Sequence, residues 1–132
     1  LKAGGGAAVS ADDHPFIAIL RRLWDSPKPV IGRINGPAFG GGVGLTAACD
    51  LVVASDSAAF SFSEVRFGVV PAMISVVVLP KIGIHHALWF FLTGEKFSAQ
   101  RAAEIGLVHR VVPAAQLDAA VDEVAAMIRL GG

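Results

Sequence analysis

The sequence predicts an α/β fold in which strands alternate with helices within one domain. Continuous apolar runs such as LVVAS, residues 51–55, are typical of strands buried on both faces of a parallel sheet. Stretches with helical periodicity separate these runs, and this alternation is the order found in α/β folds. The chain has 132 residues without an internal repeat or a charged linker, so one domain with its own core accounts for its length.

The helices are predicted from the spacing of apolar residues and from residues that favour helix ends. Pro15 stands at a permitted N-terminal position, Ser98 is a favoured N-cap, and Gly106 is a favoured residue just after a C-terminus. In the last helix, apolar residues recur every three or four positions and form one stripe. The predicted helices are 15–25, 43–50, a helix that starts at the turn of Pro71, 85–94, 98–105 and 117–130, the last with its stripe at Leu117, Val121, Val124 and Ile128.

Short apolar runs bounded by turn residues predict the strands. These are 30–34, 51–55 and 109–113, with a further extended segment at 58–64. The first residues are rich in Gly and Ala and predict a flexible loop. The expected organisation is a loop over 1–14, a core over 15–113 and a C-terminal helix over 114–132.

Composition excludes two classes of partner. Apolar residues make up 54% of the chain and charged residues 17%, below the charged share of about 25% in typical soluble domains. We therefore expect surfaces that are buried against more chain or other subunits. No apolar run approaches the ~20 uncharged residues of a membrane span, so no membrane association is expected. The net charge is zero and no Lys/Arg stripe is present, so a nucleic-acid partner is not expected either.

The single cysteine and the four histidines carry no sign of a metal or disulfide site. Cys49 excludes an intramolecular disulfide and fits a reducing compartment, so we expect a cytoplasmic protein. It lies in an apolar helical run, which predicts an inert buried thiol. His14, His85, His86 and His109 lack metal-ligand spacing, so no metal is expected. The chain begins without Met and without the apolar segment of a signal peptide.

Three consecutive glycines, Gly40 to Gly42, lie between a predicted strand with its turn and the start of a helix. Each glycine inside a helix lowers the stability of the helix by about 1 kcal/mol relative to alanine. A structural or functional requirement must therefore account for the triplet. The first N–H groups of a helix are unpaired and lie at the positive end of the helix dipole, and glycine lets a ligand oxygen approach them. The triplet lacks the Lys-Ser/Thr pair of a phosphate loop and matches the dinucleotide fingerprint only loosely. Two explanations of the triplet remain, an oxyanion site and a close packing of the helix on the strand.

Glu64 is the acidic residue with the strongest sign of a chemical role. Asp50, which follows the short helix, is expected to be structural. Apolar neighbours would desolvate the Glu64 carboxylate, which raises its pKa and suits it to proton transfer. The alternative is that Glu64 pairs with Arg66 on a surface. The neighbours of Glu64 are Phe60, Phe62, Val65 and Phe67.

Two long stretches resemble a known family. The stretch KPVIGRINGPAFGGGVGLTAACDLVVASDSAAFSFSEVRFGVVPA, residues 28–72, resembles the core signature of the crotonase family, also called the enoyl-CoA hydratase/isomerase superfamily. The stretch LTGEKFSAQRAAEIGLVHRVVP, residues 92–113, is similar to that family's second characteristic segment. The resemblance extends from residue 28 to about 130. It implies part of a crotonase-like (ClpP/crotonase) ββα spiral, with sheets packed roughly at right angles and subunits that form homotrimers or hexamers.

The resemblance also implies a substrate and an oxyanion hole. The family binds acyl-CoA thioesters and holds the thioester oxygen with two backbone N–H groups, one of which corresponds to the Gly41 amide, flanked by Gly40 and Gly42. Such donors contribute about 3 kcal/mol each in other oxyanion holes. The second donor would lie just before residue 1, so we expect the chain to be a piece that lacks this donor, the early strands and the last helices. Lys2 falls where family members place a lysine near the CoA ribose and phosphate, with a solvated loop lysine as the alternative.

The chain departs from the two-glutamate members of the family. Their second glutamate corresponds to Glu64, but the position of their first glutamate is Gly44. Single-glutamate relatives include Δ3,Δ2-enoyl-CoA isomerases and bacterial hydratases of the methylglutaconyl-CoA or branched-chain type, whose motifs look like those of this chain. We therefore expect an enoyl-CoA hydratase of fatty acid metabolism, with an isomerase or a non-catalytic acyl-CoA-binding homologue as alternatives.

The expected hydratase chemistry needs one acid/base group. Glu64 takes a proton from the water that attacks C3, the Gly41 amide holds the enolate, and the same proton returns to C2 in a syn addition. The backbone N–H of Ala72 would help to place the water. Coenzyme A belongs to the substrate, so no further cofactor is expected.

Four apolar residues are candidates for the acyl pocket wall, and each of them can equally be ordinary core. The adjacent histidines His85 and His86 are expected at the surface or in an interface. The wall candidates are Phe39, Phe67, Met73 and Ile74.

Overall fold

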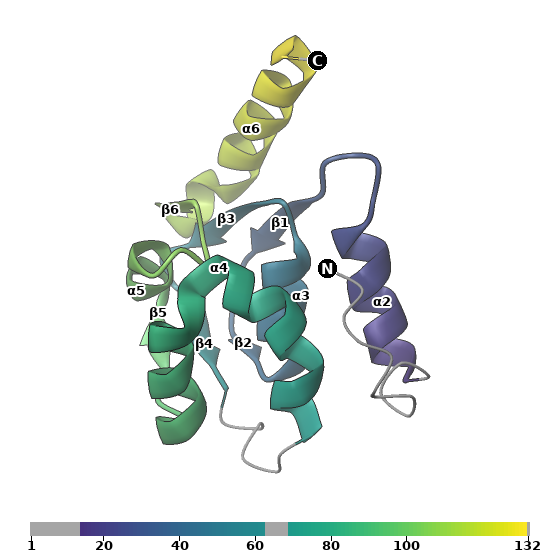
Figure 1. Cartoon of the computed structure of the whole chain (residues 1–132). Coiled ribbons are helices and arrows are strands. Elements are labelled where there is room, and N and C mark those ends of the chain that lie inside the picture. Colours follow the sequence, from purple (N-terminus) through teal and green to yellow (C-terminus); the bar gives the residue numbers. More distant parts are fainter. Residues whose placement is uncertain (1–13, 63–68, 132) are drawn as a thin grey trace.

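A computed structural model describes residues 14–62 and 69–131, with side chains in the second range from Met73 onward. In chain order the elements are α2 (Pro15–Trp24), β1 (Ile31–Ile34), β2 (Ala38–Phe39), α3 (Gly41–Ala48), β3 (Leu51–Ser55), β4 (Ala59–Ser61), α4 (Val69–Thr93), β5 (Phe97–Ser98), α5 (Ala99–Glu104), β6 (Arg110–Val112), a 3₁₀ turn (Ala114–Gln116) and α6 (Leu117–Gly131). Helices separate the strands, as the sequence predicts, but strands also follow one another directly, as β1 and β2 do and β3 and β4 do (Figure 1).

The first sheet confirms the prediction of buried parallel strands. Its order is β1-β3-β6 and both pairings are parallel, with Ile31 opposite Leu51 and Val53 opposite Arg110. The central strand β3 is buried from Val52 to Ser55. A strand that is covered on both faces has no polar side to display, which is why its sequence is a continuous apolar run.

The second sheet contains two strands that the sequence did not predict. Its order is β2-β4-β5, with β2 parallel and β5 antiparallel to β4. Strands β2 and β5 have two residues each. Two residues are too few for an alternating pattern, so only their pairing with β4 identifies them as strands.

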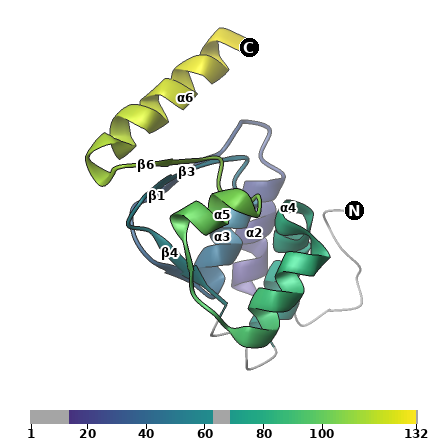
Figure 2. The ribbon, with the colours of Figure 1, turned by 90° about the vertical axis from the view of Figure 1, so that its left-hand side faces the viewer.

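The predicted helix ends are confirmed. The Ser98 hydroxyl accepts a hydrogen bond from Arg101 N at 3.0 Å and caps α5, and Gly106 follows that helix with φ of 94°. In α6, Leu117 and Val124 are buried, and the rest of the predicted stripe packs around them and Val53 of β3. Beyond this contact, the C-terminal part of α6 extends away from the sheets (Figures 1 and 2).

Helix α4 confirms the prediction of two helices in this stretch, which are joined across a kink. It runs from Val69 to Thr93 and bends at one non-helical residue, Gly83, with φ of 79° and ψ of 162° (Figure 1). Pro71 lies in its first turn rather than before it, a place where the missing N–H costs nothing because that turn has unpaired N–H groups anyway. The helix ends before Gly94, as predicted.

The same helix contains a segment that is long and apolar enough to cross a membrane. This segment is Met73–Thr93. The search for an uninterrupted run of about 20 uncharged residues missed it, because a single lysine, Lys81, divides it. One third of it is buried inside this fold. Its buried side chains belong to the main hydrophobic core, and Lys81 Nζ donates to the carbonyl of Cys49 at 2.9 Å. Part of this segment therefore packs into the core of this fold.

Helix α3 lies at the centre of the core, between α2 and α4. Val43 and Ala48 are fully buried on it. Aromatic rings join α4 to the second sheet, with ring centroids 4.3 Å apart for Phe90 and Phe97 and 5.5 Å apart for Phe60 and Phe97. The two-residue strand β5 is therefore held by packing as well as by its hydrogen bonds.

Two residues after α3 are structural, as the sequence predicts. Asp50 Oδ2 accepts a hydrogen bond from Val30 N at 2.8 Å, and Asp50 N donates to the Val30 carbonyl, so the acid joins β3 to the start of β1. Cys49 is buried at the C-cap of α3 and its Sγ donates to the Leu45 carbonyl at 3.3 Å. Burial raises the pKa of the Cys49 thiol, the charge of Asp50 raises it further, and Lys81 partly opposes this.

We expect Gly106→Ala to lower the free energy of unfolding by about 2 kcal/mol or more. A Cβ atom on Gly106 would lie 2.8 Å from the backbone oxygen of Lys81, and the φ of 94° is rarely adopted by other residues. Gly36→Ala is the control, since no atom lies within 4 Å of its added Cβ and its φ is not positive. Urea unfolding measures both, and equal losses would contradict the assignment.

We expect the Cys49 thiol to react with a disulfide reagent at pH 8 at least about tenfold more slowly in the folded protein than in urea. Burial shields the sulfur and raises its pKa, which lowers the fraction of reactive thiolate. The folded rate should rise as pH rises, because the thiolate fraction rises. Cys49 is the single cysteine of the chain, so the colour released reports this residue alone. Equal reaction rates in the folded and the unfolded protein would contradict the prediction that the thiol is inert.

Candidate active site

The turn from β2 into α3 depends on Gly40. Its φ of 54° and ψ of −114° form a backbone conformation that side chains with a Cβ rarely adopt. Gly40 N donates to the Ser61 carbonyl at 2.8 Å, so the pairing of β2 with β4 continues for one residue beyond β2. The chain then turns and α3 begins at Gly41. The first glycine of the triplet is therefore explained by the backbone alone.

The next two amides lie at the positive end of α3. Within the described ranges, neither Gly41 N–H nor Gly42 N–H has an acceptor. No acidic residue lies in the first turn of α3 and no side chain caps it. Both glycines are partly exposed, so an oxygen atom from outside the fold can approach them. The predicted oxyanion donor, Gly41, thus has the hydrogen-bonding state that this role requires.

The space around the triplet differs from one glycine to the next. A Cβ atom on Gly41 would lie 3.2 Å from Cζ of Phe16, which packs on it from α2. A Cβ atom on Gly42 would meet Ala38 Cβ at an ordinary 3.5 Å. Packing thus favours glycine at position 41 and sets no such demand at position 42. Sequence reasoning did not assign Phe16 to the site, and no local signal could have done so, because its contact is made between two helices.

Gly44, one turn further along α3, packs directly against α4. A Cβ atom on Gly44 would lie 2.5 Å from Cγ2 of Ile74. This distance is far inside ordinary van der Waals contact. The position at which two-glutamate relatives carry a carboxylate is therefore closed by a neighbouring side chain in this structure.

The structure places only some of the predicted site residues. Phe39 ends β2, next to the triplet, and Lys96 Nζ lies 5.4 Å from the centroid of its ring. Met73 and Ile74 are buried in the core, as the alternative to a pocket wall predicted. Ala72 lies in the first turn of α4. Lys2, Glu64 and Phe67 lie outside the described residues.

Two of the histidines accept hydrogen bonds from backbone N–H groups. His14 Nδ1 accepts from Phe16 N at 3.1 Å as the N-cap of α2, and His109 Nδ1 accepts from Val52 N at 3.1 Å. His85 and His86 are adjacent on α4, with ring centroids 6.0 Å apart. Among the residues that the structure describes, no group of three or more His, Cys, Asp or Glu side chains could hold a metal ion.

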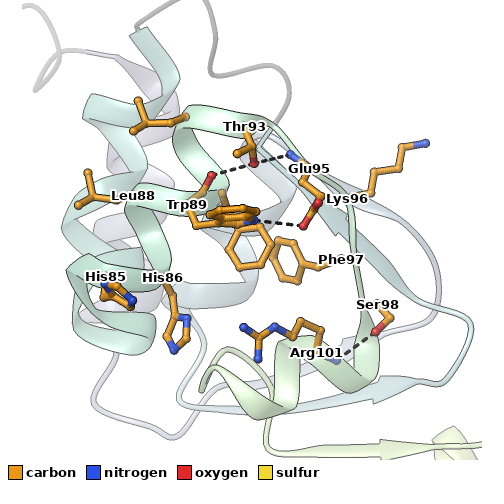
Figure 3. A pocket seen from close by; sticks show the side chains of 12 residues that line it. His85, His86, Leu88, Trp89, Thr93, Glu95, Lys96, Phe97, Ser98 and Arg101 are labelled. Carbon is orange, nitrogen blue, oxygen red and sulfur yellow. Dashed lines mark hydrogen bonds between the residues drawn. The ribbon is translucent and has the colours of Figure 1, made fainter.

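A cavity of about 920 Å³ lies beside the second half of α4, β5 and α5, away from the glycine triplet (Figure 3). Trp89 Nε1 donates to Glu95 Oε1 at 3.1 Å across it, and the histidine pair lies at its rim. Of the predicted site residues whose side chains the structure describes, none lines it. A smaller cavity of about 400 Å³ borders β1 and α3 and includes Gly42.

Known proteins resemble this chain over most of its length. The chain is 42% identical to the hydroxycinnamoyl-CoA hydratase-lyase of Pseudomonas fluorescens over 91 residues, which are 68% of this chain and 33% of that protein. It is 40% identical to the carnitinyl-CoA dehydratase of Proteus mirabilis over 129 residues, which are 96% of this chain and 49% of that protein. The chain thus spans less than half the length of these relatives.

Solved structures and a family model lead to the same assignment. The crystal structure of enoyl-CoA hydratase from Bacillus anthracis superposes with a TM-score of 0.81 at 35% identity, covering 86% of this chain and 45% of that one. This similarity establishes the crotonase fold for the part of the spiral that the chain contains. The family model described as enoyl-CoA hydratase/isomerase matches residues 6–130. The chain belongs to the enoyl-CoA hydratase/isomerase family.

Proposed function

We propose that the protein is an enoyl-CoA hydratase, a lyase that adds water across the 2,3 double bond of an enoyl-CoA thioester. The observation that carries this proposal is the Gly41 amide, a backbone donor without an acceptor in the described structure, at the partly exposed N-terminus of α3. Hydration of an enoyl thioester places negative charge on the thioester oxygen, and such a donor stabilises that charge.

The Gly41 amide acts in the transition state more than in the ground state. The thioester oxygen accepts its hydrogen bond, and the bond strengthens as the oxygen becomes an enolate. The dipole of α3 adds to this effect because its positive end points at the same place. A single donor of this kind contributes about 3 kcal/mol in other oxyanion holes. In our proposal Gly41 is one of two donors.

Glu64 is proposed as the acid/base group. Three peptide units join it to Ser61, whose carbonyl accepts the hydrogen bond from Gly40 N. The Cα atoms of Ser61 and Glu64 can therefore be no more than about 11 Å apart, which keeps Glu64 in the neighbourhood of the donor. As the water oxygen bonds to C3, its proton passes to the carboxylate, and the protonated Glu64 then returns that proton to C2. The reaction needs no resident cofactor, because coenzyme A is part of the substrate.

A second candidate function is a Δ3,Δ2-enoyl-CoA isomerase. It is favoured by the contact of Ile74 with Gly44, which leaves Glu64 without a second carboxylate at that position. One carboxylate is enough to move a proton between two carbons of an enolate. A non-catalytic acyl-CoA-binding protein is the remaining alternative. The names of the relatives, a hydratase-lyase and a dehydratase, favour addition and elimination of water, so hydratase stays the first proposal.

Glu64→Gln is expected to slow hydration by at least about a hundredfold, because general acid–base catalysis contributes 10²–10⁴-fold. The assay follows the loss of ultraviolet absorbance of a conjugated 2-enoyl-CoA. Binding of a saturated acyl-CoA, measured by calorimetry, should be unchanged. Glu104→Gln is the control: Glu104 is an exposed glutamate paired with Arg101 at 3.0 Å, and its loss should leave the rate intact. Full activity in Glu64→Gln would remove Glu64 from the mechanism.

The same assay separates the three candidate functions. A hydratase consumes the conjugated absorbance of a 2-enoyl-CoA, whereas an isomerase generates that absorbance from a 3-enoyl-CoA. A protein that binds the saturated acyl-CoA and changes neither substrate is a binding protein.

We also propose that the protein assembles as a homotrimer or a pair of trimers. Support comes from apolar side chains on the second half of α4 that are more than half exposed, namely Ile84, Leu88, Trp89 and Leu92. Light scattering at micromolar concentration should give the mass of three or six chains. Leu92→Lys should reduce that mass, while Ile19→Lys, on the exposed face of α2, should not. The mass of a single chain at every concentration would contradict assembly.

A further inference from the structure

We propose that Ile74 determines how many carboxylates the site can contain. Its side chain fills the space that any side chain at position 44 would need, and the site therefore operates with Glu64 alone. The catalytic part of this proposal rests on the proposed function. The packing part does not, because it concerns only the contact between α3 and α4.

The contact leaves no room for adjustment by small movements. A Cβ atom on Gly44 would lie 2.5 Å from Cγ2 and 3.1 Å from Cβ of Ile74, and 3.8 Å from Cδ2 of Leu20. Carbon atoms pack best at about 3.5–4.0 Å. Ile74 is fully buried, and a β-branched side chain in a helix has one strongly preferred rotamer, so it cannot turn aside cheaply.

Residues of α2 also pack on this face of α3, with Phe16 against Gly41 and Leu20 near Gly44. Val43 of α3, the residue before Gly44, is completely buried. The surroundings of position 44 are therefore filled by residues of both α2 and α4.

Position 44 lies beside the proposed oxyanion donor. Residues three apart on a helix share a face, with about 5–6 Å between their Cβ positions, so position 44 lies one turn from Gly41 on the same side. A side chain at position 44 would be a direct neighbour of the bound thioester. The structure places the apolar Ile74 against that point instead. The choice of residue at position 74 thus decides whether position 44 can bear an acid.

A stability cycle tests the packing. Gly44→Ala should lower the melting temperature by about 5 °C or more. Ile74→Ala removes Cγ2, so in that background the further loss caused by Gly44→Ala should fall to less than half. Ile74→Val keeps a Cγ2 atom and should give no such relief. Val78→Ala makes a cavity at another fully buried position of α4 and should leave the two losses additive.

Gly42→Ala controls for the loss of a glycine from the same helix, since its Cβ would make only an ordinary contact with Ala38. It should not lower the melting temperature as Gly44→Ala does. Equal effects of Gly42→Ala and Gly44→Ala, or the same Gly44→Ala loss in every background, would overturn the packing part.

A pH–rate profile tests the catalytic part. The natural protein should show one carboxylate ionisation in its hydration rate. The double variant Gly44→Glu with Ile74→Ala should be more stable than Gly44→Glu alone, which should be strongly destabilised, and should show a second ionisation. A double variant that folds and hydrates substrate with one ionisation would overturn this part. If neither the natural protein nor any variant hydrates the substrate, the proposed function is wrong. The stability cycle still tests the contact between position 44 and Ile74.

Discussion

The arrangement of the candidate site depends on one backbone hydrogen bond, from Gly40 N to the carbonyl of Ser61. This bond extends the short pairing of β2 with β4 up to the point where the chain turns into α3. Because the turn requires a positive φ, a glycine must stand there. Once both are in place, the free amide of Gly41 and the chain that leads to Glu64 start from the same point of the fold.

The glycines of the motif have different physical reasons, although they look alike in the sequence. Gly40 is required by backbone conformation and Gly44 by the contact with Ile74, while the approach of Phe16 favours glycine at position 41. Gly42 meets no comparable constraint, so an open path to the helix N-terminus is the remaining reason for it. A candidate site for an anionic oxygen and a close helix–helix contact therefore share one short helix, because both need the same absence of side chains.

Much of the fold could be predicted because its signals are local. The parallel strand over 51–55, the N-cap Ser98 and the stripe of α6 each depend on a few neighbouring residues, and each is confirmed. The sequence prediction failed where the local signal is weak. Strands β2 and β5 are too short to show a period. The candidate site divides in the same way, since the glycines and Glu64 belong to a motif, whereas Phe16 does not.

The sequence by itself determined the α/β class and the family resemblance, and it predicted a site with a glycine-lined helix start and one carboxylate. These properties follow from residue types at short spacings. Only the tertiary structure decided that Phe16 lies on Gly41 and that Ile74 closes position 44. The partners in these contacts are 25 and 30 residues apart in the chain. Such contacts depend on how three helices pack together, and no local pattern contains that information.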